Sequence, residues 1–351
     1  MRQSTRVGLL IGGLLLVALV VVLVPFILHW TAGDKSQASL VPPPADPSVP
    51  SDPSDPSDPS DPSVPSDPAP CDNSDDAACA AALTDALLLK YRPVVYLNTA
   101  EKFFPVSIED FLANSRLVRS NNKAVLKDYG EITTQNIGSF NDVYGGAGGG
   151  PAEDLMVEIR DSAHPGTARD RLHEVPVYVA AYDDPSTNSL VAQYVFLYAY
   201  NGAQHVAGQD FGAHKGDVEH VSVFIDKTTH EITQIYFAAH NTGNGRLVTR
   251  DSGRLQFEGA QPVVYSARWS HASYEKKGKF PQGRAHTGSV IDKVSTYDDM
   301  TDDTGAKWRP DTVVVIDDTT GWNTFKGNLG GGADRGPRAP LQQKGWYGKG
   351  L

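Results

Sequence analysis

Residues 212–225 read Gly-Ala-His-Lys-Gly-Asp-Val-Glu-His-Val-Ser-Val-Phe-Ile, a glycine-flanked polar loop that runs into an apolar strand. Side chains alternate between the two faces of a strand, so Asp217 and Glu219 share a face with the apolar residues that follow them. His220 takes the opposite face. Because a lone carboxylate is costly to bury, the two acids predict either a bound cation or an ion-pair network at the start of this strand.

Four side chains in and around this stretch are of the metal-ligand type. His214 lies in the loop, Asp210 lies just before it, and Asp217 and Glu219 follow. One imidazole with two or three carboxylates suits a divalent ion such as Mg²⁺, Mn²⁺, Ca²⁺ or Zn²⁺. The alternative is a salt-bridge network to arginines such as Arg268, because ionic networks perturb carboxylates as readily as functional sites do.

Two histidines are candidates for acid–base chemistry. His271 follows the predicted strand 262–268, where it is placed to complete the metal set or to move a proton, and His220 lies in the stretch itself. His240 ends another predicted strand and is interpreted as a structural histidine. A serine hydrolase is disfavoured because the sequence contains no Gly-x-Ser-x-Gly elbow.

The rest of the chain predicts a mainly β domain. Val- and aromatic-rich segments separated by turn residues favour antiparallel sheets over alternating βαβ units. Because a sheet with an apolar face needs a second apolar layer, we expect an antiparallel β-sandwich with short helices and long loops. The predicted strands are 91–97, 175–182, 190–199, 221–226, 231–238, 262–268 and 312–316; short helices are expected at 77–89 and 106–114, and a glycine-rich surface loop at 120–153.

An uncharged apolar run, residues 7–28, precedes this domain. It is long enough to cross a bilayer as a helix, and Arg2 and Arg6 before it predict a cytoplasmic N-terminus. Residues 1–30 are therefore interpreted as a cytoplasmic tip and a transmembrane helix. The chain is then a single-pass membrane protein with an extracytoplasmic C-terminal domain. The alternative is secretion after signal cleavage within residues 31–38.

Residues 31–70 are interpreted as a disordered linker. Their Ser-Asp-Pro repeats cannot bury enough apolar surface to offset the entropy of ordering, and the prolines favour an extended chain. The exported domain then covers residues 71–351. Cys71 and Cys79, the two cysteines of the chain, predict a local disulfide on the exported side, with two unpaired thiols as the alternative.

Several stretches, in the expected order, resemble the vacuolar protein sorting-associated protein 62 family. Val218 is a departure, since that family usually has Trp at this position. The matching stretches are Tyr91-Arg-Pro-Val-Val-Tyr-Leu, Glu101-Lys-Phe-Phe-Pro-Val-Ser, Tyr198-Ala-Tyr-Asn-Gly, Gly212-Ala-His-Lys-Gly-Asp-Val-Glu-His, Ile235-Tyr-Phe-Ala-Ala-His, Pro262-Val-Val-Tyr-Ser and His271-Ala-Ser-Tyr.

The core stretch is also similar, more distantly, to the Gly-His-Arg-His-Asp-Trp-Glu heptad of the necrosis- and ethylene-inducing-like cytolysins. That resemblance implies a β-sandwich with a divalent-cation site that engages sphingolipid headgroups. It also implies metal-associated roles for His214, Asp217 and Glu219, while Gly216 replaces the second histidine of the heptad.

These observations predict a membrane-anchored, extracytoplasmic β-sandwich whose divalent-cation site binds a polar or anionic ligand, a glycan or a lipid headgroup. One alternative is a metal-dependent hydrolase, in which the cation activates water and His220 or His271 carries the proton. Another is a sorting or structural module without catalysis. The formal net charge of -11 gives no basic footprint for nucleic acid, which we do not expect as a partner.

Overall fold

The computed structural model describes residues 77–145, 150–206, 209–240, 245–282, 297–332 and 336–343. All of them belong to one structural unit, Ser60–Leu351. The predicted transmembrane helix, the Ser-Asp-Pro linker and Cys71 lie outside the described residues, so these predictions and that of the disulfide to Cys79 stay predictions. Within the described ranges, no helix is long and apolar enough to span a membrane.

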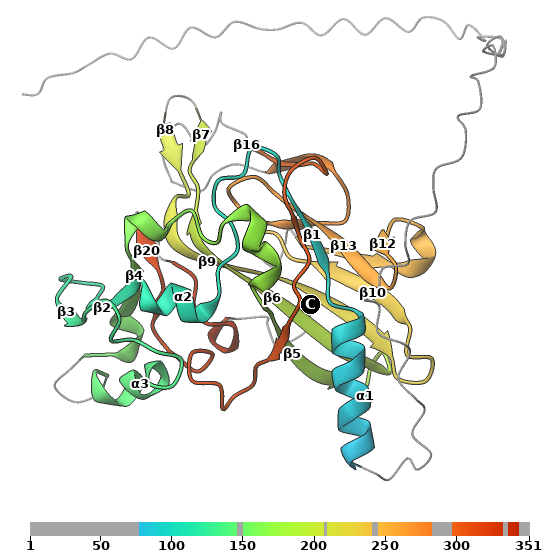
Figure 1. Cartoon of the computed structure of the whole chain (residues 1–351), viewed down its shortest axis with the longest axis horizontal. Helices are drawn as coiled ribbons and strands as arrows, with labels where there is room; N and C mark the ends of the chain where they lie inside the picture. Colours follow the sequence, from blue (N-terminus) through green and yellow to red (C-terminus); the bar gives the residue numbers. More distant parts are fainter. Residues whose placement is uncertain are drawn as a thin grey trace, which may run out of the picture. The chain divides into compact units, whose positions relative to one another are not determined.

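Two long strands form the centre of the domain. β6 (Ser189–Asn201) and β9 (His214–Asp226) are rich in β-branched and aromatic residues and pair antiparallel along their whole lengths. In the described part of the chain they belong to a seven-stranded sheet of order β11-β10-β9-β6-β5-β18, with β20 also paired to β9 (Figure 1). The other strands of this central sheet are β5 (Val177–Asp184), β10 (Ile232–Phe237), β11 (Arg246–Thr249), β18 (Val313–Val315) and β20 (Gly331–Gly332).

One face of the central sheet packs on a second sheet. Val221 and Val223 of β9 share a buried core with Val95 and Leu97 of that sheet. The Ala- and Leu-rich helix α1 (Ala77–Lys90) contributes Leu87 and Leu88 to the same core. The strands of the second sheet are β1 (Val94–Leu97), β12 (Phe257–Glu258), β13 (Gln261–Ser266), β14 (Ser273–Tyr274) and β17 (Lys307–Trp308).

The opposite face of the central sheet packs on a third sheet. Val218 of β9 and Leu197 of β6 lie in one core with Val157 of this sheet and Phe111 of the helix α2 (Ile108–Ala113). Ser107 caps α2 by accepting a hydrogen bond from the Asp110 amide at 3.1 Å. The strands of the third sheet are β2 (Ser115–Arg119), β3 (Val125–Lys127), β4 (Leu155–Ile159) and β19 (Asn328–Leu329).

Two hairpins and several short helices complete the described residues. The hairpins are β7 (Gln204–Val206) with β8 (Gln209–Phe211), which stands out from the sheets in Figure 1, and β15 (Gly278–Gln282) with β16 (Tyr297–Thr301). The short helices are η1 (Ile137–Ser139), α3 (Phe140–Val143), η2 (Ala152–Asp154), η3 (Asp161–Ala163), η4 (Arg169–Glu174), η5 (Arg250–Ser252) and η7 (Pro340–Gln342).

A mainly β fold with short helices is confirmed, and the predicted strands and helices outside residues 120–153 reappear with shifted ends. The strand pairing differs from the expectation. β1 pairs with β13, β18 with β5 and β19 with β4 in parallel, so the sheets are mixed and not purely antiparallel. Parallel neighbours need long connections, and segments far apart in the sequence supply them here.

Two local predictions also need correction. The predicted loop 120–153 contains the strand β3 and the short helices η1, α3 and η2. The strand predicted at 221–226 begins at His214, because its ladder with β6 continues through the polar residues. The stretch that looks like a loop in the sequence is therefore the first half of a central strand.

Candidate functional site

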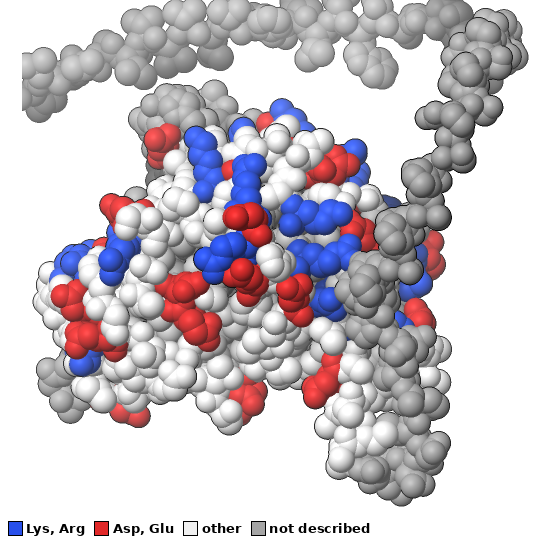
Figure 2. Space-filling model, in the orientation of Figure 1, with Lys and Arg blue, Asp and Glu red and all other residues white. Residues whose placement is uncertain are grey.

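Charged side chains on the surface over the second sheet form mixed ion pairs. Figure 2 shows Lys and Arg interleaved with Asp and Glu on this face. Lys307 and Arg309 both pair with Glu258, and Lys277 pairs with Asp303. Such accessible pairs are screened by water and contribute little to stability. The charges with larger consequences are those that the fold buries.

The inward face of β9 becomes polar at its first half. Asp217 is 5% exposed and Glu219 is half-buried. Further along the same face, Val221 and Val223 belong to the core between the central and second sheets. The assignment of faces by alternation is therefore confirmed, and β9 carries two carboxylates into the layer between two sheets.

His271 lies between Asp217 and a second buried acid, Glu101. Its Nδ1 is 2.8 Å from Asp217 Oδ2, and its Nε2 is 3.1 Å from the Phe103 carbonyl oxygen and 3.7 Å from Glu101 Oε1. Its ring stacks on Tyr198 with centroids 3.7 Å apart and planes 2° from parallel. Glu101, Tyr198, Asp217 and His271 are called the His271 cluster below.

The turn between β13 and β14 holds His271 in place. The Ala267 amide donates to the Ala272 carbonyl, and the His271 amide donates to the Ala267 carbonyl. Trp269 and His271 have φ values of 70° and 53°, in the left-handed region that costs about 1–2 kcal/mol for each residue with a Cβ. Gly202 leaves room for this turn, because a Cβ there would lie 2.8 Å from the Trp269 Cβ.

Three members of the His271 cluster, Glu101, Asp217 and His271, form an ion triad. Burial lowers the pKa of His271, but the charge of Glu101 and the hydrogen bonds to Asp217 and Glu101 outweigh it and raise the pKa to about 10. Burial works against ionisation of Glu101, yet His271 and the Trp269 and Phe103 amides hold the pKa of Glu101 below its usual value. His271 is thus an imidazolium at neutral pH and has no lone pair for a metal.

Glu219 is the nearby acid that forms no ion pair with His271. No residue in the described ranges donates a hydrogen bond to its carboxyl group. Burial, and then the negative charges of Asp217 and Asp299, raise the pKa of Glu219 well above its usual value, which the positive charge of His271 only partly offsets. In the absence of a further cation, Glu219 therefore tends to hold a proton.

A second polar group lies beside the first. Asp299 of β16 is fully buried and accepts hydrogen bonds from Ser270 Oγ at 2.8 Å and Tyr274 Oη at 2.6 Å. His240 Nε2 lies 2.7 Å from the same carboxylate, and Gln282 Nε2 donates to Tyr274 Oη at 2.6 Å. These five residues are called the Asp299 cluster. It and the His271 cluster meet at the adjacent residues Ser270 and His271.

The other predicted site residues lie in different surroundings. The His214 ring is half-buried, with Nδ1 2.6 Å from the Gly216 carbonyl oxygen of its own strand. Asp210 is exposed in the β7–β8 hairpin. His220 is buried on the opposite face of β9, where burial lowers its pKa to about 3 and keeps it neutral. The structure brings Asp217 together with His271 and places Glu219 beside them.

The described residues contain no group of three or more His, Cys, Asp or Glu side chains arranged to hold a metal ion. The ion-pair alternative is present in a different form from the predicted one. Arg268 lies over the Trp269 ring, 4.1 Å from its centroid, and His271 supplies the positive charge next to Asp217.

Sequence reasoning missed Glu101 and Asp299 as members of these clusters. Glu101 stands at the head of the stretch Glu101-Lys-Phe-Phe-Pro, which already pointed to a family, and its position between apolar segments was an available signal. Asp299 follows a tyrosine and another aspartate in a polar segment with no informative spacing. Only the tertiary fold identifies it.

Residues 71–315 match the family model of vacuolar protein sorting-associated protein 62. The chain belongs to the vacuolar protein sorting-associated protein 62 family. The predicted membership of this family is thus confirmed, and the His271 and Asp299 clusters both lie inside the matched part of the chain.

This family member also shows a distant likeness to solved structures of necrosis- and ethylene-inducing proteins. Necrosis and Ethylene inducing Protein 2, from the causal agent of cocoa's witches' broom disease, is 14% identical over 65% of this chain and 72% of that one, with a TM-score of 0.29. NLPPya in complex with mannosamine is 12% identical over 72% and 79%, with a TM-score of 0.30. A structure described as a toxin fold for microbial attack and plant defense is 12% identical over 75% and 81%, with a TM-score of 0.32. The search of curated proteins found no match.

Proposed function

We propose that this domain binds a polar or anionic ligand, a glycan or a lipid headgroup, through a divalent cation held by Asp217 and Glu219. The observation that carries the proposal is the surplus of carboxyl groups over positive charges at the start of β9. Asp217 and Glu219 share a buried face with Asp299 nearby, while the charge of His271 is already divided between Glu101 and Asp217. A cation is the direct way to balance the remaining acid.

The two acids suit the proposed cation in complementary ways. Glu219 has no hydrogen-bond donor among the described residues, so both of its oxygens are available. Asp217 accepts one hydrogen bond on each oxygen, from His271 and from the Val218 amide, and keeps lone pairs for a ligand bond. Carboxylates that bind metals are commonly oriented by such hydrogen bonds.

The nature of the ligand follows from the same geometry. Mg²⁺ is often held by one or two carboxylates and keeps several water molecules, and Ca²⁺ takes oxygen ligands from several sources. A cation on Asp217 and Glu219 would leave coordination positions for oxygens of a hydroxyl, phosphate or carboxylate. Carboxylate oxygens also bind Mn²⁺ and Zn²⁺, so both ions are further candidates. The proposal does not draw on His214, whose ring bonds its own strand, or on the exposed Asp210.

The proposed setting is the outer face of a membrane. The apolar run in residues 1–30 would anchor the chain, and the linker 31–70 would hold the domain away from the bilayer. Secretion after cleavage of a signal peptide is the alternative. In either case the domain would meet ligands outside the cytoplasm.

A metal-dependent hydrolase has less support. A proton carrier works best when its pKa lies near the operating pH. The pKa of His271 is raised to about 10 and that of His220 is lowered to about 3, so neither predicted carrier exchanges protons readily at neutral pH. This observation favours binding over hydrolysis at these two residues.

Thermal unfolding of the purified full-length chain tests the cation. After treatment with a chelator, addition of Mg²⁺, Ca²⁺, Mn²⁺ or Zn²⁺ should raise the Tm, since a ligand at a hundred times its Kd stabilises the folded state by about 2.7 kcal/mol. Glu219→Gln should abolish this rise and increase the stability of the cation-free protein, because it removes a repelled carboxyl group. The exposed control Glu174→Gln should respond as the wild type does.

The result that contradicts the proposal is equally direct. If none of the four cations changes the Tm of the wild type more than that of Glu219→Gln, and metal analysis of the purified chain finds no stoichiometric ion, the site does not hold a cation.

A further inference from the structure

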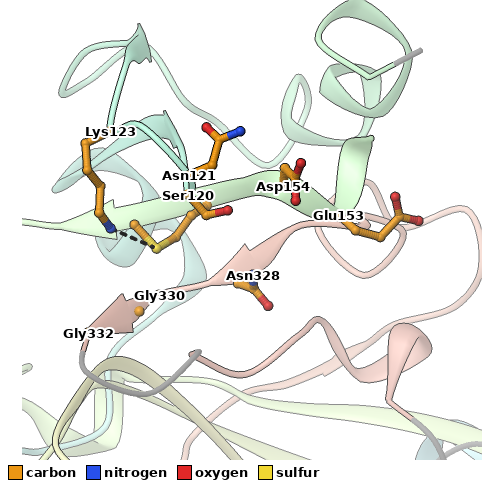
Figure 3. A pocket seen from close by; sticks show the side chains of 10 residues that line it. Ser120, Asn121, Lys123, Glu153, Asp154, Asn328, Gly330 and Gly332 are labelled. Atoms are coloured by element: carbon orange, nitrogen blue, oxygen red, sulfur yellow. Dashed lines mark hydrogen bonds between the residues drawn. The ribbon is translucent and has the colours of Figure 1, made fainter. Parts of the chain in front are cut away.

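A pocket of about 300 Å³ lies at the third sheet, apart from the clusters described above. Its lining comes from the β2–β3 turn, the short helix η2, the strand β4, and the strands β19 and β20 with the residue between them (Figure 3). It shares no residue with the His271 cluster or the Asp299 cluster. The side chains that matter here are Asn121, Lys123, Glu153, Asp154 and Asn328.

Asn328 is a largely buried residue whose amide lines the pocket. It is 7% exposed, and its backbone is fixed by pairing with Met156 of β4 and by a bridge to Arg338. No hydrogen bond within the described part of the chain reaches its side chain, which lines the pocket. Asn328 therefore presents both a donor and an acceptor to the pocket.

The charged side chains of the pocket are open to solvent, with Lys123 and Glu153 exposed and Asp154 half-buried. The contact of the Lys123 ammonium is with the Met156 thioether, with Nζ 3.9 Å from Sδ, and not with a carboxylate. Glu153 and Asp154 form no ion pair within the described ranges. In Figure 3, Lys123 lies at one side of the pocket and Glu153 at the other, with Asp154 and Asn328 between them. Opposite charges thus line one pocket without neutralising each other.

Two backbone features support a built site. Lys123 has a φ of 58°, in the left-handed region that a residue with a Cβ seldom adopts, and such strain clusters at functional sites. Gly330 has a φ of 117°, and a Cβ there would lie 1.6 Å from the Lys215 carbonyl oxygen. Gly330 therefore lets the backbone beside the pocket pack closely on β9.

We propose that this pocket binds a small zwitterion, with a phosphate or carboxylate group at Lys123 and an ammonium group at Asp154 and Glu153. The Asn328 amide lies between the two ends and is free to donate to and accept from the linking atoms. The free volume suits a molecule the size of an amino acid or phosphoethanolamine. The site is separate from the proposed cation site and does not depend on it.

Isothermal titration calorimetry of the full-length chain in a non-ionic detergent tests this pocket, with O-phosphoethanolamine as the probe. The wild type should show saturable binding at one site. Lys123→Met and Asp154→Asn should each weaken it at least about tenfold, as expected for the loss of a charge-assisted hydrogen bond. The control Lys127→Met, which alters a lysine paired with Glu131 outside the pocket, should bind as the wild type does.

Inorganic phosphate and ethanolamine, the two halves of the probe, test the two ends of the pocket separately. Lys123→Met should lose affinity for inorganic phosphate and keep its affinity for ethanolamine, and Asp154→Asn should do the reverse. Asn328→Leu should weaken all three probes. These variants change accessible or unpartnered side chains, and an unchanged circular dichroism spectrum verifies that they fold.

Vesicles distinguish the source of the zwitterion. Sedimentation with phosphatidylethanolamine vesicles that is lost in Lys123→Met supports a lipid headgroup, and binding of the free probe without sedimentation supports a soluble molecule. The proposal is overturned if the wild type binds no probe, if Lys123→Met and Asp154→Asn bind O-phosphoethanolamine as the wild type does, or if a chelator abolishes binding, which would place the probe at the cation site.

Discussion

The His271 cluster and the pocket at β19 and β20 are both polar regions of one domain, but they differ in how their charges are matched. In the cluster, the imidazolium of His271 donates to Asp217 and to a backbone carbonyl, and Glu101 accepts three backbone amides. In the pocket, the side chains of Lys123, Asp154 and Asn328 form no ion pair in the described ranges, and the one hydrogen bond among them is the weak contact of Lys123 with the Met156 thioether. A saturated network stabilises the fold, whereas an unsaturated one is available to a ligand.

The largest loss of unfolding free energy is expected from substitution of His271. His271→Leu removes the positive charge and leaves Glu101 and Asp217 buried next to each other without a cation. Breaking a buried ion pair in this way costs about 3–5 kcal/mol of unfolding free energy. Urea unfolding of the full-length chain measures the loss, and the exposed histidine control His173→Leu should change little. A loss at His271 no larger than the control's would mean that the cluster is not a stabilising network.

A pH dependence of stability follows from the same residue. The folded pKa of His271, about 10, lies above its unfolded value of about 6.5, so its contribution is complete below pH 6.5. Stability should then fall as the pH rises from about 6.5 to about 10, by at most about 1.4 kcal/mol per pH unit. Unfolding midpoints measured across this window check the slope. His271→Leu should flatten it, and an equal slope in that variant would assign the effect to other groups.

The smallest effect, and one of opposite sign, is expected in the pocket. Asn328→Leu replaces an unpartnered buried amide by an apolar side chain of similar shape. Because no hydrogen bond to the described part of the protein is lost, the unfolding free energy should stay level or rise by about 1 kcal/mol. Urea unfolding gives the value, with Asn141→Leu as a control that removes a bonded amide and should destabilise. A substantial loss in Asn328→Leu would show that its amide has a stabilising role.

Part of this picture could be predicted from the sequence. Alternation along residues 217–225 places Asp217 and Glu219 on the inward face of a strand, because the period of two is a local property of extended chain. The residue at which that strand begins could not be predicted in the same way. His214 belongs to β9 because β6 is long enough to pair with it. The length of a partner strand cannot be inferred from the residues around His214.

The members of the His271 cluster could not be predicted from local sequence patterns either. Glu101, Asp217 and His271 come from three separate parts of the chain, and their meeting depends on the parallel pairing of β1 with β13. A histidine at the end of a strand signals chemistry in general terms. Whether it binds a metal, moves a proton or is locked between two acids depends on neighbours that only the fold supplies.

The parallel pairing of β1 with β13 also has a consequence for how the chain acquires its fold. Val94 of β1 pairs with Val263 of β13, so most of the domain must be synthesised before this strand finds its neighbour. Contacts between residues so distant in sequence close slowly, because the entropy of the long loop is lost before the contact is gained. During that interval the Val-rich edge of β1 is unpaired, which makes the early chain prone to aggregation and the complete domain late to form.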